Sequence, residues 1–214
     1  YPFLQQNGND RNKPVSFCDL IFICLKEHDR VFKISEILKK IYSDEIKVLF
    51  TEEVTRGAAE TALLAKKFFG SDEDIIISDS DSHFDATPLW KAILNKEQNT
   101  VGILPVVKPL DTKPLWSYIV LENKYVKDVR EKDKILAESG AYGIIGGYYF
   151  SHGYDFVKEC EEMISENDVS GEAGKKEFYM SQIYNRMVRK NKQVEITKIE
   201  KCGVMGTPEQ LDNF

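Results

Sequence analysis

The sequence has no apolar stretch that could cross a membrane, no excess of basic residues and no regular cysteine spacing. A membrane-spanning helix needs about 20 consecutive apolar residues, whereas apolar runs here, such as DLIFICL at residues 19–25, have the length of one strand. The formal net charge is −6, and general nucleic-acid binding depends on a basic surface. We therefore expect neither a membrane nor a nucleic acid as a partner.

Cysteine-based structure is also not indicated. The four cysteines, Cys18, Cys24, Cys160 and Cys202, show no C-x-x-C spacing, so neither a zinc site nor a disulfide framework is predicted. The N-terminus has no signal-peptide pattern, and no Ser/His/Asp or Cys/His arrangement indicates a nucleophilic enzyme. These absences favour a reducing, cytoplasmic location.

The first half of the chain alternates between strand and helix patterns. An apolar strand is predicted at residues 19–25, a helix with a stripe of apolar side chains at 31–41, and a strand at 46–50. A second helix follows Gly57, and a third strand covers residues 74–78. Strands that alternate with helices predict parallel pairing through right-handed crossovers, which is a Rossmann-like arrangement.

The second half has a different pattern. Strands are expected at 100–107, 117–122, 125–129, 143–150 and 193–199, helices at 154–166 and 177–190, and a helix start at Thr207-Pro208. Residues 131–142 are expected to form a charged loop. With 214 residues we predict one α/β domain, a Rossmann-like three-layer α/β/α fold with a mixed, mostly parallel central sheet. Residues 1–18 would be an irregular segment, 19–87 a nucleotide-binding half and 88–214 the half that completes a substrate pocket.

The stretch from Thr51 to Asp85 carries the strongest functional signal. Its strand ends directly before Asp79-Ser80-Asp81, at the edge of an open α/β sheet where ligands bind. Two carboxylates there suit Mg²⁺, which takes one or two carboxylates together with substrate phosphate oxygens. Upstream, Gly57 and two alanines would let a flat or anionic ligand approach a helix start. The simpler alternatives are a turn-capping Asp81 and an ordinary helix start at Gly57.

Five short motifs, taken in order, resemble the sugar-phosphate nucleotidyltransferases, which have the nucleotide-diphospho-sugar transferase fold. They are Gly57-Ala58-Ala59-Glu60-Thr61, the strand-end Asp81, Glu131-Lys132, Gly147-Tyr148-Tyr149-Phe150 and Gly206-Thr207-Pro208-Glu209. The resemblance covers roughly residues 19–214, and each motif alone is weak. Their shared order and spacing is what makes the set specific.

The resemblance implies a role for each motif and a reaction. Nucleotide-binding residues would be Gly57, Ala58, Ala59, Glu60 and Asp79; the metal ligand would be Asp81; catalytic residues would be Asp81 and Lys132; and sugar-phosphate-binding residues would be Glu131, Lys132, Gly147 and Tyr149. The reaction would join a nucleoside triphosphate to a sugar 1-phosphate with Mg²⁺ and release pyrophosphate, in nucleotide-sugar and surface-polysaccharide synthesis. Whether the chain forms a homo-oligomer is left open.

The sequence differs from the motifs of this family in two ways, and both keep alternative functions open. The family's glycine-rich phosphate loop, with a Gly-x-Gly-x-Arg core, is not found, which would fit either a fragment or a chain that has lost this loop. Val204 and Met205 occupy the region where many members have a second metal-binding aspartate. The alternatives are a glycosyltransferase of the same fold family, whose metal-binding motif would be Asp79-Ser80-Asp81, and a non-catalytic nucleotide-binding relative.

Overall fold

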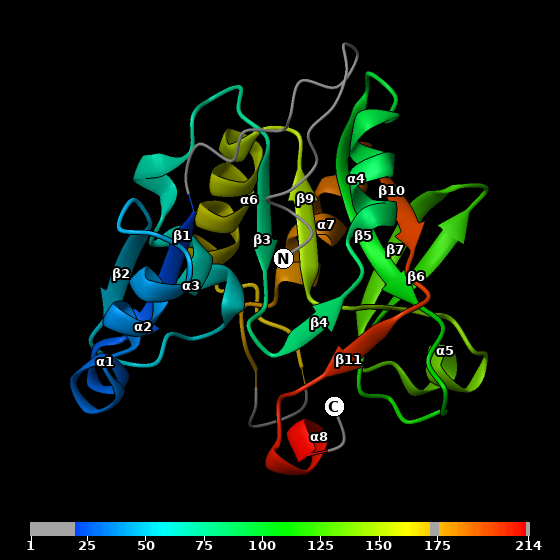
Figure 1. Cartoon of the computed structure of the whole chain (residues 1–214). Helices are drawn as coiled ribbons and strands as arrows, with labels where there is room; N and C mark the ends of the chain where they lie inside the picture. The colour runs from blue at the N-terminus through cyan, green and yellow to red at the C-terminus, as the bar shows by residue number, and fades with distance from the viewer. Residues whose placement is uncertain (1–19, 172–175, 213–214) are drawn as a thin grey trace, which may run out of the picture. The chain divides into compact units, whose positions relative to one another are not determined.

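The structure of the chain is a computed structural model that describes residues 20–171 and 176–212 (Figure 1). The contacts divide the chain into two compact units, Tyr1–Arg56 and Gly57–Phe214. The predicted irregular segment 1–18 lies outside the described residues. Within the described residues, no helix is both long enough and apolar enough to cross a membrane.

The first unit contains two parallel strands and two helices. Strand β1 (Ile21–Leu25) pairs in parallel with β2 (Lys47–Thr51), which confirms the parallel pairing predicted for the strands at 19–25 and 46–50. The helical segment between them is interrupted, because α1 (Lys26–Phe32) and α2 (Ile34–Ile41) are separated by Lys33 in the left-handed conformation (φ 54°). Asp29, on α1, accepts a hydrogen bond from the Ser35 backbone N–H at 2.7 Å and so fixes this break.

The second unit is built on a seven-stranded sheet with strand order β10-β7-β6-β8-β5-β9-β3 (Figure 1). Its strands are β3 (Ile75–Ser78), β5 (Thr100–Val107), β6 (Ser117–Glu122), β7 (Tyr125–Glu131), β8 (Tyr142–Ile144), β9 (Gly147–Phe150) and β10 (Gln193–Lys198). Among the described pairings of this sheet, β10–β5 is parallel and the others are antiparallel. The mixed α/β prediction is confirmed, whereas a mostly parallel sheet is not.

The antiparallel character has two local causes. The β6–β7 hairpin turns at Asn123 (φ 58°), and a hairpin enforces antiparallel pairing. The single strand predicted at 143–150 is two strands, because Gly146 adopts φ 75° and breaks it. As a result β8 pairs with β6 and β5, while β9 pairs antiparallel with β5 and β3.

Helices cover both faces of this sheet. On one face are α3 (Ala58–Leu63), α6 (Gly153–Ser165) and α7 (Met180–Arg189), and on the other is α4 (Thr87–Leu94). The main core lies under α6 and α7, where Phe156, Phe178 and Tyr184 are fully buried. A smaller core lies under α4. The two faces matter for the site, since successive residues of a strand point to opposite faces.

Several short elements complete this unit. Strands β4 (Ser82–Phe84) and β11 (Cys202–Val204) form an antiparallel pair, and Figure 1 shows β11 leading on to α8 (Pro208–Asp212). The predicted charged loop contains a helical turn, α5 (Lys134–Glu138), and residues Lys66–Phe68 form a 3-10 turn. The predicted helix start is confirmed, because Thr207 Oγ1 accepts the Gln210 N–H at 3.2 Å.

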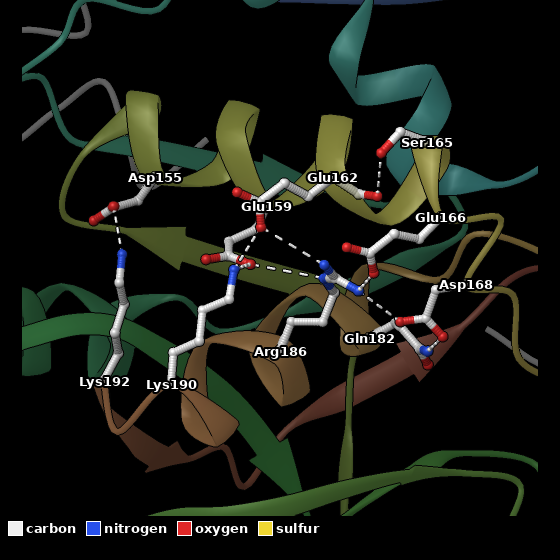
Figure 2. Close-up of polar contacts among 10 residues, drawn as sticks. All are labelled: Asp155, Glu159, Glu162, Ser165, Glu166, Asp168, Gln182, Arg186, Lys190 and Lys192. Carbon is white, nitrogen blue, oxygen red and sulfur yellow. Dashed lines mark hydrogen bonds and ion pairs between the residues drawn. The ribbon is translucent and has the colours of Figure 1, made fainter.

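An arginine joins the two long helices. Figure 2 shows Arg186 of α7 pointing into a group of carboxylates on and after α6. It lies 2.8 Å from carboxylate oxygens of both Glu166 and Asp168, and its Nε lies 3.7 Å from Glu159. Glu159 is only 1% exposed and also binds Lys190 at 2.7 Å. The network therefore supplies counter-charges to a buried carboxylate in the helical layer behind the sheet.

Candidate active site

Asp79 and Asp81 lie directly after β3, as predicted. The Asp79 backbone N–H donates to the Gly146 carbonyl at 2.8 Å, which extends the β3–β9 pairing by one step and fixes the backbone of Asp79. Asp79 is half-buried and Asp81 is exposed. The Asp79 carboxylate is therefore partly enclosed, whereas the Asp81 carboxylate is open to solvent.

The Asp79 carboxyl is closely surrounded on one side. Its Oδ2 atom accepts a hydrogen bond from the Tyr148 hydroxyl at 3.3 Å, and a Cβ atom added to Gly146 would lie 2.8 Å from the same oxygen. Burial and the negative charge of Asp81 raise the Asp79 pKa to about 6, and the Tyr148 hydrogen bond opposes this shift. The two aspartates are thus close enough to interact electrostatically.

The closing Gly206-Thr207-Pro208 segment lies against Asp81. The β4–β11 ladder pairs Val204 with Ser82, and the Met205 N–H then donates to the Asp81 carbonyl at 2.7 Å. A Cβ atom at Gly206 would lie 3.0 Å from Asp81 Oδ2. Two motifs about 125 residues apart in the sequence therefore meet at one carboxylate.

Glu131 and Lys132 follow at the end of β7. The Glu131 carboxylate accepts hydrogen bonds from the hydroxyls of Ser117 and Ser181, the latter at 3.2 Å. Its charge also contributes to the raised Tyr148 pKa, after burial and Asp79. This carboxylate was predicted, but its two serine partners were not.

Lys132 has an unusual backbone. It adopts φ 51°, its N–H donates to the Trp116 carbonyl at 2.9 Å, and its ammonium lies 5.8 Å from the centre of the Tyr179 ring. A non-glycine residue in the left-handed region is uncommon and is found at turns and at functional sites. Here it turns the chain sharply after β7, so that Glu131 and Lys132 point to different partners.

The Gly57 loop is explained in part by packing. A Cβ atom at Gly57 would lie 2.6 Å from the backbone N and O of Phe178, and the Ala59 N–H donates to the Phe178 carbonyl at 3.1 Å. Ala59 is fully buried, whereas Ala58 is exposed and Glu60 is half-buried. The small residues are thus needed for close contact with the chain at Phe178, whose neighbour Tyr179 contacts Lys132.

Two predicted sugar-binding residues, Gly147 and Tyr149, face the opposite side of the sheet from Tyr148. A Cβ atom at Gly147 would lie 2.8 Å from side-chain atoms of Phe84 and of Pro105. Tyr149 is 1% exposed, packs in the smaller core under α4, and donates its hydroxyl to Asp74. The structure therefore does not bring Tyr149 to the aspartates. Tyr148, which points to the opposite face, is the tyrosine that reaches them.

The carboxylate oxygens of Asp79 and Asp81 are ligands that suit a hard divalent cation. No group of three or more His, Cys, Asp or Glu side chains within the described residues has a metal-binding arrangement. A pair such as Asp79 and Asp81 is nevertheless what Mg²⁺ uses when phosphate oxygens and water complete its coordination. The open side of Asp81 leaves room for such ligands.

Comparisons with known proteins agree with this arrangement at the level of the fold. No protein-family model and no curated protein matches the chain. Among solved structures, the nucleoside-diphosphate-sugar pyrophosphorylase from Vibrio cholerae RC9 is similar, with a TM-score of 0.72, 19% identity, and coverage of 90% of this chain and 78% of that one. The chain has the fold of the sugar-phosphate nucleotidyltransferases.

A second solved structure similar to the chain is that of the inositol-1-phosphate CTP transferase from T. maritima. Its TM-score is 0.65 at 14% identity, and the match covers 90% of this chain and 71% of that one. The resemblance seen in the sequence is therefore confirmed as a likeness of fold, and the roles of individual residues are taken up as proposals.

Proposed function

We propose that the chain acts in a sugar-1-phosphate nucleotidyltransferase reaction. An oxygen of the sugar 1-phosphate attacks the α-phosphorus of a nucleoside triphosphate, and the bond from that phosphorus to pyrophosphate breaks. The products are a nucleotide sugar and pyrophosphate. Such a nucleotide sugar is the kind of donor that surface-polysaccharide synthesis consumes.

The observation that carries this proposal is the meeting of distant motifs on one edge of the sheet. Asp79 contacts Tyr148, and Asp81 contacts the segment that carries Gly206. Phosphoryl transfer needs little covalent help from a protein, since most of the catalysis comes from positioning and charge stabilisation. Two carboxylates that could hold a divalent cation at this edge are suited to that task.

Each group has a distinct task in this reaction. Asp79 and Asp81 would hold Mg²⁺, which supplies neutralisation of phosphate charge when bound. Lys132 binds the sugar phosphate as a point charge, and Glu131, fixed by two serine hydroxyls, accepts hydrogen bonds from sugar hydroxyls. The nucleotide base lies along the exposed side of the Gly57 loop, at Ala58 and Glu60.

The test is a panel of nucleoside triphosphates combined with sugar 1-phosphates, assayed for pyrophosphate release with Mg²⁺. The best pair should also raise the melting temperature, because a ligand at about a hundred times its Kd adds roughly 2.7 kcal/mol of stability. Asp81→Asn should lose both the turnover and the metal-dependent part of the shift. A wild-type chain that neither turns over nor is stabilised by any pair would contradict the proposal.

A second candidate is favoured by the spacing of Asp79-Ser80-Asp81 alone. A glycosyltransferase of this fold family would use the same pair to bind the diphosphate of a nucleotide sugar through a metal. Adding nucleotide sugars to the panel separates the two, because this candidate predicts stabilisation by a nucleotide sugar with Mg²⁺ and no pyrophosphate release from any pair of nucleoside triphosphate and sugar 1-phosphate.

A further inference from the structure

Tyr148 is a buried tyrosine whose hydroxyl faces the carboxylates of the site. It belongs to β9, is paired with Ile77 of β3 and is 7% exposed. Its hydroxyl donates to Asp79 Oδ2 at 3.3 Å. Among the described residues, Tyr148 is the one whose side chain donates a hydrogen bond to the Asp79 carboxyl. Tyr148 therefore determines the orientation of that carboxyl.

The ring of Tyr148 is itself held in place. It stacks on Tyr184, with ring centroids 6.3 Å apart and an interplanar angle of 29°. Tyr184 is fully buried and donates its hydroxyl to the Tyr149 carbonyl at 2.7 Å. A stacked, buried ring cannot change rotamer without opening the core, so its hydroxyl is a fixed reference point for Asp79.

The chemistry of a tyrosine hydroxyl suits this position. A tyrosine hydroxyl is a neutral donor at physiological pH, since its ordinary pKa is about 10. A neutral donor orients a carboxylate without cancelling the negative charge that attracts a cation, whereas a lysine or arginine in its place would compete with the metal.

We propose that Tyr148 is a positioning residue, which holds the Asp79 carboxylate in the orientation that lets Asp79 and Asp81 bind a divalent cation together. This inference rests on the metal site in the proposed function. Gly146 leaves room for this arrangement, because a Cβ atom there would lie 2.8 Å from Asp79 Oδ2 and 3.1 Å from Ser82 Oγ.

Tyr149, the next residue along the strand, provides a matched control. It too is buried and donates its hydroxyl to an aspartate, but this is Asp74, and the ring packs under α4 on the other face of the sheet. Tyr148→Phe and Tyr149→Phe each delete one tyrosine hydroxyl bound to a carboxylate, in the same strand. Only the first deletion removes a contact to the proposed metal site.

The experiment measures Mn²⁺ binding by electron paramagnetic resonance, without nucleotide and without turnover. Tyr148→Phe should weaken Mn²⁺ affinity about tenfold, the effect of losing a group that orients a metal ligand. Tyr149→Phe should leave the affinity within about twofold of wild type. Equal affinities for wild type and Tyr148→Phe, with binding that is lost in Asp81→Asn, would overturn the positioning role while leaving the proposed metal site intact.

A double-mutant cycle tests whether Tyr148 acts through Asp79. If it does, adding Tyr148→Phe to Asp79→Asn should produce no further loss of Mn²⁺ affinity. A tenfold loss in both backgrounds would mean that Tyr148 acts by another route, and the inference would be wrong. Mn²⁺ binding that is absent in wild type, or unchanged in Asp81→Asn, would overturn the metal site and this inference with it.

Discussion

Gly206 lies directly against the Asp81 carboxylate, since a Cβ atom at position 206 would be only 3.0 Å from Asp81 Oδ2. The contact brings the closing segment of the chain onto the strand end that carries the aspartates. It also gives a physical reason for glycine in the Gly-Thr-Pro motif of this sequence. Any larger residue would have to push the carboxylate aside.

Gly206→Ala should therefore weaken metal binding more than it weakens the fold. Asp81 is exposed and can move away from the added methyl group, so we expect a melting temperature close to wild type. The displaced carboxylate should bind Mn²⁺ about tenfold more weakly. Gln210→Ala, which changes the other neighbour of this position, is the control and should bind Mn²⁺ normally. Normal binding by Gly206→Ala would contradict the role of this contact.

Gly57→Ala should destabilise the protein strongly. Gly57 adopts φ 151°, and an added Cβ atom would lie 2.6 Å from the backbone N and O of Phe178. Backbone atoms cannot move aside as a side chain can, so we expect a loss of about 2–4 kcal/mol in the free energy of unfolding, measured with urea.

The neighbouring Ala58→Gly variant is the control for Gly57→Ala. Ala58 is exposed in the first turn of α3, so this change should cost no more than about 1 kcal/mol, the difference in helix propensity. A Gly57→Ala protein as stable as Ala58→Gly would mean that the loop adjusts freely. In that case packing would not explain the glycine, and ligand contact would become its main reason.

The strand-end aspartates could be predicted because they depend on local pattern. An apolar run followed by Asp79 and Asp81 identifies a strand and its carboxyl end from adjacent residues alone. The helix start at Thr207-Pro208 is equally local. Pairing partners are not local, however: β3 pairs with β9, about 70 positions away, and nothing within either strand specifies an antiparallel neighbour.

The hydrogen bond between Ser117 and Glu131 shows why the site could be predicted only in part. Starting from the turn, Glu122 pairs with Tyr125, and a regular hairpin would then pair Ser117 with Arg130. A bulge between Val120 and Leu121 shifts the register by one residue and brings Ser117 opposite Glu131. Bulges of this kind depend on sheet twist and tertiary packing, so the support for Glu131 could not be read from the sequence.

Tyr148 and Tyr149 illustrate the same limit on one strand. Alternation places them on opposite faces of β9, but the sequence does not say which face the aspartates occupy. The smaller core under α4 takes Tyr149, and the face with Tyr184 takes Tyr148. A one-residue change in register would exchange their roles.

Arg186→Met should destabilise the second unit by about 3–5 kcal/mol, because it leaves a buried carboxylate with too little counter-charge. Glu159 is 1% exposed, Arg186 is 10% exposed, and the remaining partner of Glu159 would be Lys190 (Figure 2). Urea unfolding measures the loss. Arg189→Met, an exposed change on the same helix, should stay within about 0.5 kcal/mol of wild type.

A second substitution that removes the charge of Glu159 tests why Arg186→Met lowers the stability. Adding Glu159→Gln to Arg186→Met removes the unpaired charge and should recover part of the stability. If the double variant is less stable than Arg186→Met by the full cost of a second independent mutation, then the loss comes from packing of the arginine side chain and not from the buried charge.

Without a bound metal, Asp79 should make the folded state less stable as the pH rises. Burial and the charge of Asp81 raise its pKa to about 6 in the folded chain, compared with about 3.9 in an unfolded chain. The folded state therefore favours the protonated carboxyl. The stability that this group contributes is fully present below about pH 4 and is lost as the pH rises through about 6.

Asp79→Asn should remove this dependence, because an amide does not ionise. We expect the variant to gain stability relative to wild type between pH 4.5 and 7.5, by at most about 3 kcal/mol for a shift of about two pKa units. Urea unfolding in a chelating buffer at both pH values measures the gain. Asp72→Asn, an exposed change of equal charge, controls for net charge. If Asp79→Asn and wild type differ in stability by the same amount at both pH values, the prediction is wrong. The pKa of Asp79 would then not be raised by burial or by a nearby Asp81 carboxylate.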